Sequence, residues 1–244
     1  MIVAAHQPHY LPWLGYLDKL AKSDLFVVMD DLQFEDQNFQ NRQRVKLAAG
    51  PHWLSVPLLR AEQTARICDR RIDNTGRGGR HHWQHRHWRS LVIHYGRAPF
   101  FAQFAPALED VYARPWDYLL ELDLHMLELA RTWMRITKPI VRASSLGLRG
   151  QKTERIVSLC QAVGARSYLT GRGGSVGYLD TNLMARAGIS VIWQRFHHPH
   201  YPQRYPGLGF ASHLGFLDLL FNCGPDATAI AWSGGEAVTE GPTP

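Results

Sequence analysis

The chain has few cysteines and no long apolar run. Its three cysteines, Cys68, Cys160 and Cys223, are widely spaced, odd in number and without a CxxC pair, which argues against a disulfide framework or a zinc knuckle. No window approaches the roughly 18 apolar residues of a membrane span, and the N-terminus lacks the basic and apolar regions of a signal peptide. We therefore expect reduced thiols, a cytoplasmic protein and no membrane partner.

Several motifs of catalytic and metal sites are also missing. The sequence contains no GxSxG elbow and no GK[ST] after a glycine-rich loop, so neither a serine nucleophile nor a Walker site is indicated. In HHWQHRH, His81 and His85 stand one helical turn apart, the spacing that zinc pairs use. No acid occupies the position that an HExxH motif requires, so we predict no metal site and interpret this cluster as an exposed aromatic helix face.

Acidic residues are outnumbered, since 27 Lys and Arg face 21 Asp and Glu for a net charge of +6. An excess of cations suits an anionic substrate or a nucleic acid, although ordinary arginine-rich usage explains it equally well. The content of 45% hydrophobic and 20% charged residues is typical of a folded chain. We expect a single α/β domain over residues 1–228 and a frayed tail at 229–244, which is poor in apolar residues.

Apolar runs and helical spacing alternate at both ends of the chain. A buried strand at 1–5, a helix at 13–22 and a second buried strand at 25–30 predict a parallel βαβ unit with a right-handed crossover. The pattern as a whole indicates an α/β fold, a Rossmann-like parallel sheet with an α-rich insertion or lid at about 78–136. Its further elements are strands at 52–59, 138–144, 167–171 and 189–196, and helices at 80–96, 115–135, 152–164 and 213–224.

Chemically rich loops follow three of the predicted strands, namely HQPHYLPW, DDLQF and GRGG. Because ligands bind beyond the carboxyl ends of parallel strands, we expect these loops to share one edge of the sheet and one cleft. His6 ends the first strand near the start of a helix, which suits either a base or phosphate ligand or a buried structural histidine. His9 is expected on the surface.

Polar residues after the second strand offer groups for a charged substrate. Asp30 and Asp31 form a carboxylate pair that suits magnesium or a cationic amine, and such pairs also serve as caps and turn residues. Asn41, Arg42 and Lys46 would supply hydrogen-bond donors to an anion, or else belong to a solvated basic loop.

The C-terminal third adds two further candidate segments. Gly171 and Arg172 open the GRGG loop, whose backbone amides could approach a phosphate, although the match to known phosphate loops is weak. Asp180 in the same region could hold a hydroxyl or an amine. Tyr201 and Gln203 lie among prolines that fix the backbone, which places them at the mouth of a pocket or in a tight-turn scaffold.

The sequence resembles the WbqC-like protein family through several blocks that occur in the family's order from residue 2 to about 226. The blocks are HQPHYLPWLGYLDKLAKSD, DDLQF with QNRQRVK, KTERIVSLCQAVGARSYLTGRGGSVGYLD, HPHYPQRY and FLDLLFNCGP. The residues that match recurring positions of the family are His6, Gln7, Tyr10, Gly15, Tyr16, Lys19, Asp31, Gln33, Asn41, Arg42, Gly171, Asp180, Tyr201 and Gln203.

The resemblance implies an amide-forming enzyme of surface-polysaccharide or natural-product biosynthesis, because some members are labelled glycine transferases. A small acyl or aminoacyl group would pass to an amine on a nucleotide-linked sugar or related metabolite. The donor would be activated in place with ATP and magnesium, or arrive on tRNA or a carrier protein. The catalytic candidates are His6, Lys19, Asp31 and Asp180, with Asp30 or Asp31 orienting the amine and Lys19 and Arg42 binding anionic groups.

Two other functions remain open. The layout of the first βαβ unit is similar to that of HIGH-type nucleotidyltransferases and pantothenate synthetase, in which histidines at a helix N-terminus steady phosphates during adenylate formation. Here Tyr16 stands where the second histidine is expected, and it keeps a hydrogen-bond donor but carries no positive charge. The third alternative is a non-catalytic module that binds a nucleotide sugar or RNA by stacking and phosphate contacts.

Overall fold

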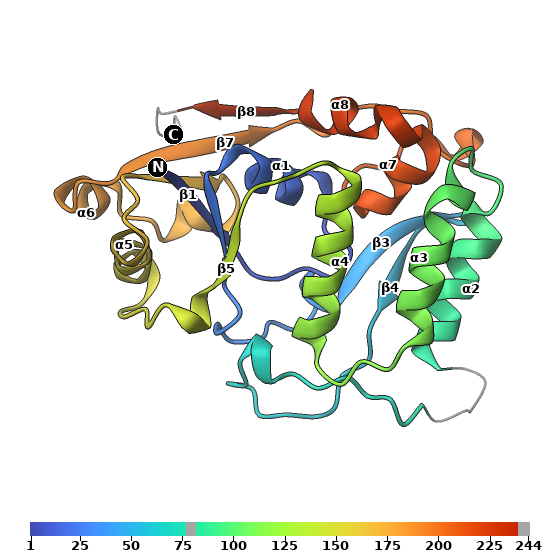
Figure 1. The fold of residues 1–244 in the computed structure, drawn as a ribbon, viewed down its shortest axis with the longest axis horizontal. Coiled ribbons are helices and arrows are strands. Elements are labelled where there is room, and N and C mark those ends of the chain that lie inside the picture. The colour runs from blue at the N-terminus through green and yellow to red at the C-terminus, as the bar shows by residue number, and fades with distance from the viewer. Residues whose placement is uncertain (77–81, 239–244) are drawn as a thin grey trace.

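The computed structural model describes residues 1–76 and 82–238, and a mostly parallel sheet forms its centre (Figure 1). Neighbouring strands pair in parallel except β7 and β8, which are antiparallel. The predicted α/β fold with a Rossmann-like sheet is therefore confirmed. Within the described residues the spatial order of the strands is β5 (Ile140–Arg142), β2 (Leu25–Val28), β1 (Ile2–His6), β6 (Ser167–Gly171), β7 (Ser190–Phe196) and β8 (Gly235–Val238).

The central strand β1 is covered on both faces, which explains its unbroken apolar sequence. Ala4 belongs to the larger core with α1, whereas Val3 and Ala5 belong to a second core with α5 and α6. Successive side chains of a strand point to opposite faces, so helices on both sides bury all three. The helices concerned are α1 (Leu14–Lys22), α5 (Lys152–Ala162) and α6 (Thr181–Arg186).

The strand order reverses between β1 and β6. From β1 the chain passes through α1 to β2 and later to β5 at one edge, and it then crosses to β6 on the other side of β1. The loops that leave β1 and β6 therefore run to opposite faces of the sheet. In open parallel sheets the crevice at such a reversal is the general position for a ligand.

An antiparallel hairpin follows β2, where the sequence predicted a single strand at 52–59. It pairs β3 (Arg42–Leu47) with β4 (Gly50–Ser55). The prediction missed β3 because its buried positions include the polar residues Gln43 and Lys46. Both side chains make hydrogen bonds inside the protein. For example, the Gln43 side-chain amide donates to the Leu11 carbonyl at 3.0 Å.

The middle third is helical, as predicted, but it contains a helix that the sequence analysis missed. The missed helix is α3, which contains Pro106, a residue that lacks the N–H group of an interior helical hydrogen bond. Phe104, Leu108 and Val111 nevertheless bury one face of α3 in the same core as α1 and α7. The bounds are α2 (Trp83–Tyr95), α3 (Phe101–Ala113), α4 (Leu119–Trp133) and α7 (Phe216–Cys223).

Part of the C-terminal tail that we expected to fray is ordered, which corrects the prediction for 229–238. Helix α8 (Ala227–Trp232) leads into β8, which pairs with β7. A Cβ atom at Gly235 would lie 2.1 Å from the Asp18 carboxylate, so the tail passes close to α1 and a larger residue here would displace that side chain. The rest of the predicted tail, 239–244, and the start of the predicted insertion, 77–81 with His81, lie outside the described residues.

Short 3₁₀ helices connect several of these elements, at Ile67–Asp69, Ala143–Ser145, Gly174–Gly177, Pro206–Leu208 and Gly224–Asp226. Within residues 1–76 and 82–238, no helix combines the length and apolar character that crossing a membrane requires.

Candidate functional site

A cavity of about 1000 Å³ opens at the carboxyl ends of β1, β6 and β7, where the strand order reverses. Helices α1 and α5 lie on opposite faces of the sheet (Figure 1), and the first turns of both contribute residues to the cavity lining. The expectation that the loops after β1 and β6 share one edge is confirmed. The sequence-predicted residues that line the cavity are His6, Gln7, Tyr16, Lys19, Gly171 and Arg172.

The base of the cavity is a cluster of aromatic and basic side chains from β1 and α1. The rings of His6 and His9 lie 4.7 Å apart between centroids, and each lies within 5.1 Å of the Tyr16 ring. His9 is only 4% exposed, so the expectation of a surface position was wrong. The ring of Phe39, in the 34–41 loop, covers His9, and the two ring centroids lie 5.5 Å apart. The position of His9 beside Pro8 in the sequence did not indicate this contact.

The electrostatics of this cluster keep its imidazoles neutral. Burial lowers the pKa of His6 well below its ordinary value, and the nearby Lys19 charge lowers it further. The same two causes lower the pKa of His9 to about 3. Burial alone lowers the pKa of Lys19 to about 8. At neutral pH both histidines can therefore accept or donate a hydrogen bond through a free ring nitrogen, and the buried His9 Nδ1 has no partner among the described residues.

Trp13 forms part of the cavity wall, and its position explains why residue 15 is a glycine. Its ring packs over Gly15 so closely that a Cβ atom there would lie 2.2 Å from it. The ring also lies 5.5 Å from the rings of Phe196, at the end of β7, and His213. These three residues give the cavity an aromatic side.

The cavity is strongly cationic. Among the described residues, its lining contains one acidic side chain, Glu35, whose carboxylate accepts from Gln7 at 3.2 Å and from Asn38 at 2.6 Å. The cationic lining residues are Lys19, Lys152, Arg155, Arg172 and Arg195. All of these except Arg155 lack an ion pair within the described part of the chain. An anionic ligand would supply the missing counter-charge.

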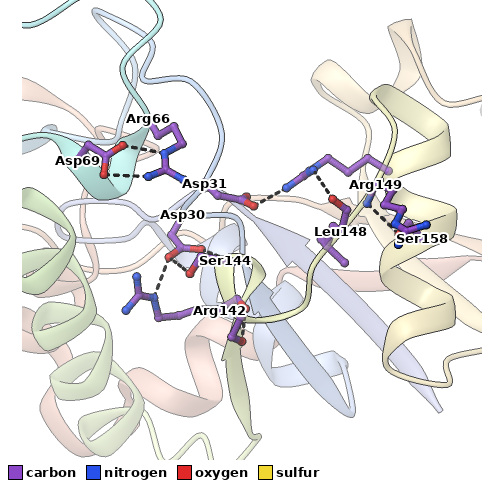
Figure 2. Close-up of polar contacts among 11 residues, drawn as sticks. Asp30, Asp31, Arg66, Asp69, Arg142, Ser144, Leu148, Arg149 and Ser158 are labelled. Atoms are coloured by element: carbon purple, nitrogen blue, oxygen red, sulfur yellow. Dashed lines mark hydrogen bonds and ion pairs between the residues drawn. The ribbon is translucent and has the colours of Figure 1, made fainter.

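Asp31 acts on the cavity indirectly, through Arg155. The Asp31 carboxylate, labelled in Figure 2, accepts a hydrogen bond from the guanidinium of Arg155 on α5. The two side chains are only 16% and 17% exposed, so the pair is well shielded from water. Asp31 itself does not line the cavity and instead holds a cation that does.

Asp30 is turned away from the cavity, which corrects the expectation that it would face His6. Figure 2 shows its carboxylate directed at Arg142 and Ser144. Arg142 Nε and the Ser144 hydroxyl donate at 2.7 Å, and the Ser144 amide donates at 2.9 Å. Burial raises the pKa of Asp30, but these donors outweigh it and leave the pKa below its ordinary value. Asp30 thus ties β2 to the segment after β5.

Lys46 and Gln203 meet in a second buried polar cluster, away from the cavity. Lys46 Nζ donates to the Gly209 carbonyl at 2.6 Å and to Gln203 Oε1 at 3.2 Å. Gln203 and Tyr95 donate to the two oxygens of Asp218 at 3.0 and 2.7 Å. Burial raises the pKa of Asp218 to about 6, although these partners and Lys46 oppose it. Tyr201, predicted at the pocket mouth, is also buried beside Asp218.

The other predicted site residues serve local structure. The Tyr10 hydroxyl lies 2.6 Å from that of Tyr112 and 2.9 Å from His87 Nδ1, on the side of α2 and α3. Asp180 caps α6 by accepting from the Asn182 and Leu183 amides. The remaining three are Gln33, which donates to Gln63; Asn41, which donates to Val56; and Arg42, which donates to Gln37 and stacks over Trp53.

Sequence reasoning missed several cavity residues, and the local signal for two of them was present. Lys152 and Arg155 lie in the first turn of α5, the helix that follows β5 after the 3₁₀ helix Ala143–Ser145 and a loop. Cations near the start of a predicted helix that follows a strand indicate that edge of the sheet. Arg195 and Phe196 end β7 in the same way. His213 enters from a loop distant in sequence, and no local pattern indicated it.

The described residues do not fit a protein-held magnesium ion. Within them no group of three or more His, Cys, Asp or Glu side chains is placed to hold a metal. Both aspartates that we considered for magnesium already bind arginines, and Glu35 is bound by two amides. The phosphates of ATP, in contrast, match the cationic lining.

Comparisons with known proteins agree with the sequence resemblance. The sequence model of the WbqC-like protein family matches residues 7–230. The chain is similar to the uncharacterized protein Rv1507c of Mycobacterium tuberculosis, with 31% identity over 228 residues that cover 92% of this chain and 95% of that protein. No solved structure matches.

Proposed function

The chain belongs to the WbqC-like protein family, and we propose that it is an enzyme that forms an amide by passing a small acyl or aminoacyl group to an amine on an anionic metabolite. The observation that carries this proposal is the single cavity at the β1–β6 reversal, which joins a neutral His6 and His9 to a cationic rim. A nucleotide-linked amino sugar has the charge and the functional group that such a cavity would take.

The rim supports an anionic substrate through charge and through helix geometry. Lys152 and Arg172 are exposed cations at its edge that form no ion pair with the residues described in the structure, and Arg155 is held in place by Asp31. The N-terminal turn of α5, whose cap residue makes no side-chain hydrogen bond, borders the same space. Free amides and the helix dipole at such a terminus favour phosphate or carboxylate groups.

The size of the cavity supports a reaction between two molecules. Binding sites for one drug-sized ligand have volumes of roughly 300–1000 Å³. The cavity of about 1000 Å³ is at the upper end of that range, so donor and acceptor can lie side by side. His6 would hydrogen-bond the reacting groups, and the negative charge of a bound substrate would raise its pKa toward the range useful for proton transfer.

The test is a transfer assay with three forms of the donor: glycine with ATP and magnesium, glycyl-tRNA, and a glycyl thioester on a carrier. Amino-sugar nucleotides serve as acceptors, and mass spectrometry detects the amide. We expect one donor to give product, and His6→Ala to lose turnover while it keeps affinity for the acceptor. The control is His85→Ala, because His85 is exposed on α2 and does not line the cavity. Product from none of the donors, or equal turnover by His6→Ala, would overturn the proposal.

Adenylate formation is a second candidate, because His9 lies beside His6 in space. In the sequence, Tyr16 occupies the position where this layout has its second histidine. In the structure, the centroids of the His6 and His9 rings lie 4.7 Å apart near the start of α1. Two neutral imidazoles at that point could donate hydrogen bonds to the phosphates of ATP. Exchange of labelled pyrophosphate into ATP in the presence of glycine tests this candidate, and no exchange would leave transfer from a pre-activated donor.

A further inference from the structure

Lys19 is a buried amine without a counter-ion. It lies on α1, is 6% exposed and lines the cavity beside Gly171, where a Cβ atom would lie 3.7 Å from its Nζ. Among the described residues, Lys19 Nζ makes no hydrogen bond and no ion pair. Burial of an unpaired ammonium group is unfavourable, so this position needs an explanation beyond packing.

Lys46 shows how the same fold treats a structural lysine. It is 1% exposed, but its Nζ donates to the Gly209 carbonyl at 2.6 Å and to Gln203 Oε1 at 3.2 Å, with Asp218 close by. The two lysines are both buried, and they differ in their partners. Lys46 is satisfied within the protein, whereas Lys19 faces a cavity that can admit a reactant.

The groups around Lys19 do not balance its charge. Asp18, next to it on α1, is bound to Lys22 at 2.7 Å and to Gln194 at 2.6 Å, and the Glu35 carboxylate is taken by two amides. The other titratable groups that line the cavity with it are neutral or cationic: His6, His9, Tyr16, Arg155, Arg172, Arg195, Lys152, Tyr168, Tyr178, His197 and His213. These groups supply no counter-charge, and burial favours the uncharged amine.

We propose that Lys19, in its uncharged form, is the base that takes the proton from the acceptor amine. This inference rests on the proposed function and names the catalytic group within it. The acceptor ammonium gives one proton to Lys19 Nζ, and the resulting amine attacks the acyl carbon. The C–N bond forms, the bond from that carbon to the leaving group breaks, and the leaving group departs with the electron pair. The second proton of the amine passes through His6 to the leaving group.

The chemistry of the two amines is matched. The pKa of Lys19, lowered by burial to about 8, is close to the roughly 7.7–8.0 of an amine flanked by an electron-withdrawing group, such as an α-amino group. Transfer of a proton between groups of similar pKa near the working pH is what general-base catalysis requires. An ordinary lysine, with a pKa of roughly 10.4, would hold its own proton at that pH.

The first experiment measures Lys19 in the whole protein without any substrate. Lysines are labelled with ¹³C at Cε, the NMR signals are followed from pH 6 to 11, and Lys19→Arg assigns the Lys19 signal by its loss. We expect the Lys19 signal to titrate near pH 8, well below the roughly 10.4 of an ordinary lysine. Titration of Lys19 at that ordinary value would overturn the inference whatever the transfer assay shows.

The second experiment separates a base from an anchor for an anion. Lys19→Arg keeps a positive charge but cannot become neutral at working pH, so we expect kcat to fall by roughly 100-fold or more with little change in acceptor affinity. In the unaltered protein we expect kcat/KM to rise with pH through a limb near pH 8. Lys138→Arg is the control. Retained turnover in Lys19→Arg would overturn the inference alone, whereas no product from any donor would overturn the proposed function and the inference with it.

Discussion

Replacement of Lys19 by methionine should stabilise the protein, because it removes a buried charge that has no partner. Burial lowers the pKa of Lys19 from 10.5 to about 8. Since one pKa unit corresponds to about 1.4 kcal/mol, the folded state loses about 3 kcal/mol by keeping this amine protonated. Methionine has a similar length and no charge, so Lys19→Met should raise the free energy of unfolding at pH 7 by an amount of that order. For a chain of this size this corresponds to a rise in Tm of roughly 6–12 °C.

The gain should depend on pH in a definite direction. Between pH 8 and 10.5 the unfolded chain binds a proton at this lysine that the folded chain has released, so the stability of the unaltered protein rises with pH across that window. The difference between Lys19→Met and the unaltered protein should therefore be largest below pH 8 and should disappear as the pH approaches 10.5.

Urea unfolding of both proteins, followed by tryptophan fluorescence from pH 7 to 10, measures this difference. Lys46→Met is the matched control, because it removes a buried lysine whose Nζ is hydrogen-bonded within the protein. That variant should lose about 1–3 kcal/mol, since it takes away the donor to the Gly209 carbonyl and to Gln203 Oε1. A destabilised Lys19→Met, or a gain that does not change with pH, would refute the account of Lys19 as an unbalanced charge.

Three further outcomes follow from individual contacts. Asp31→Asn removes the ion pair that holds Arg155, so pyrophosphate affinity measured by calorimetry should fall roughly tenfold, or about 1.4 kcal/mol, and unchanged affinity would show that Arg155 needs no anchor. Gly15→Ala forces the Trp13 ring to move and should lower stability by about 1–3 kcal/mol; an unchanged Tm and fluorescence spectrum would contradict the contact. Asp30→Asn should destabilise by about 3 kcal/mol at pH 7. Because the pKa of Asp30 in the folded protein lies below its ordinary 3.8, the difference from the unaltered protein should shrink as the pH falls from 3.8 through that lowered value, and acid unfolding checks this.

The regular elements with a clear periodicity were predictable. Strands β1 and β2 are apolar runs because both of their faces are buried. Helix α1 has apolar residues at helical spacing because one of its faces packs into the core. The failures have physical causes: β3 buries polar residues that are satisfied by distant partners, and α3 tolerates Pro106 because its aromatic face packs into the core. β8 has a weak sequence signal and forms by pairing with β7.

The candidate site was predictable where one loop provides it and not where segments meet. The position of His6, at the end of a strand and beside the start of a helix, could be predicted from the single segment HQPHYLPWLGY. Parallel strands and their crossover helices have one handedness, which fixes this arrangement. Asp31 was singled out for its position after β2, but its role depends on Arg155, which lies 124 residues later in the chain. Such a pair is set by the packing of α5 against the sheet and leaves no local pattern.

The sequence by itself determined an α/β chain with a histidine-rich loop at the edge of a parallel sheet, because side-chain periodicity and the positions of prolines are local properties. Only the tertiary structure decided what each charged side chain does. Lys19 and Lys46 are the same residue type, and both are buried. One is satisfied by a carbonyl and an amide from residues 203–209, and the other faces an open cavity. The free energy of a buried charge depends on the groups that surround it in space, and these groups come from distant parts of the chain.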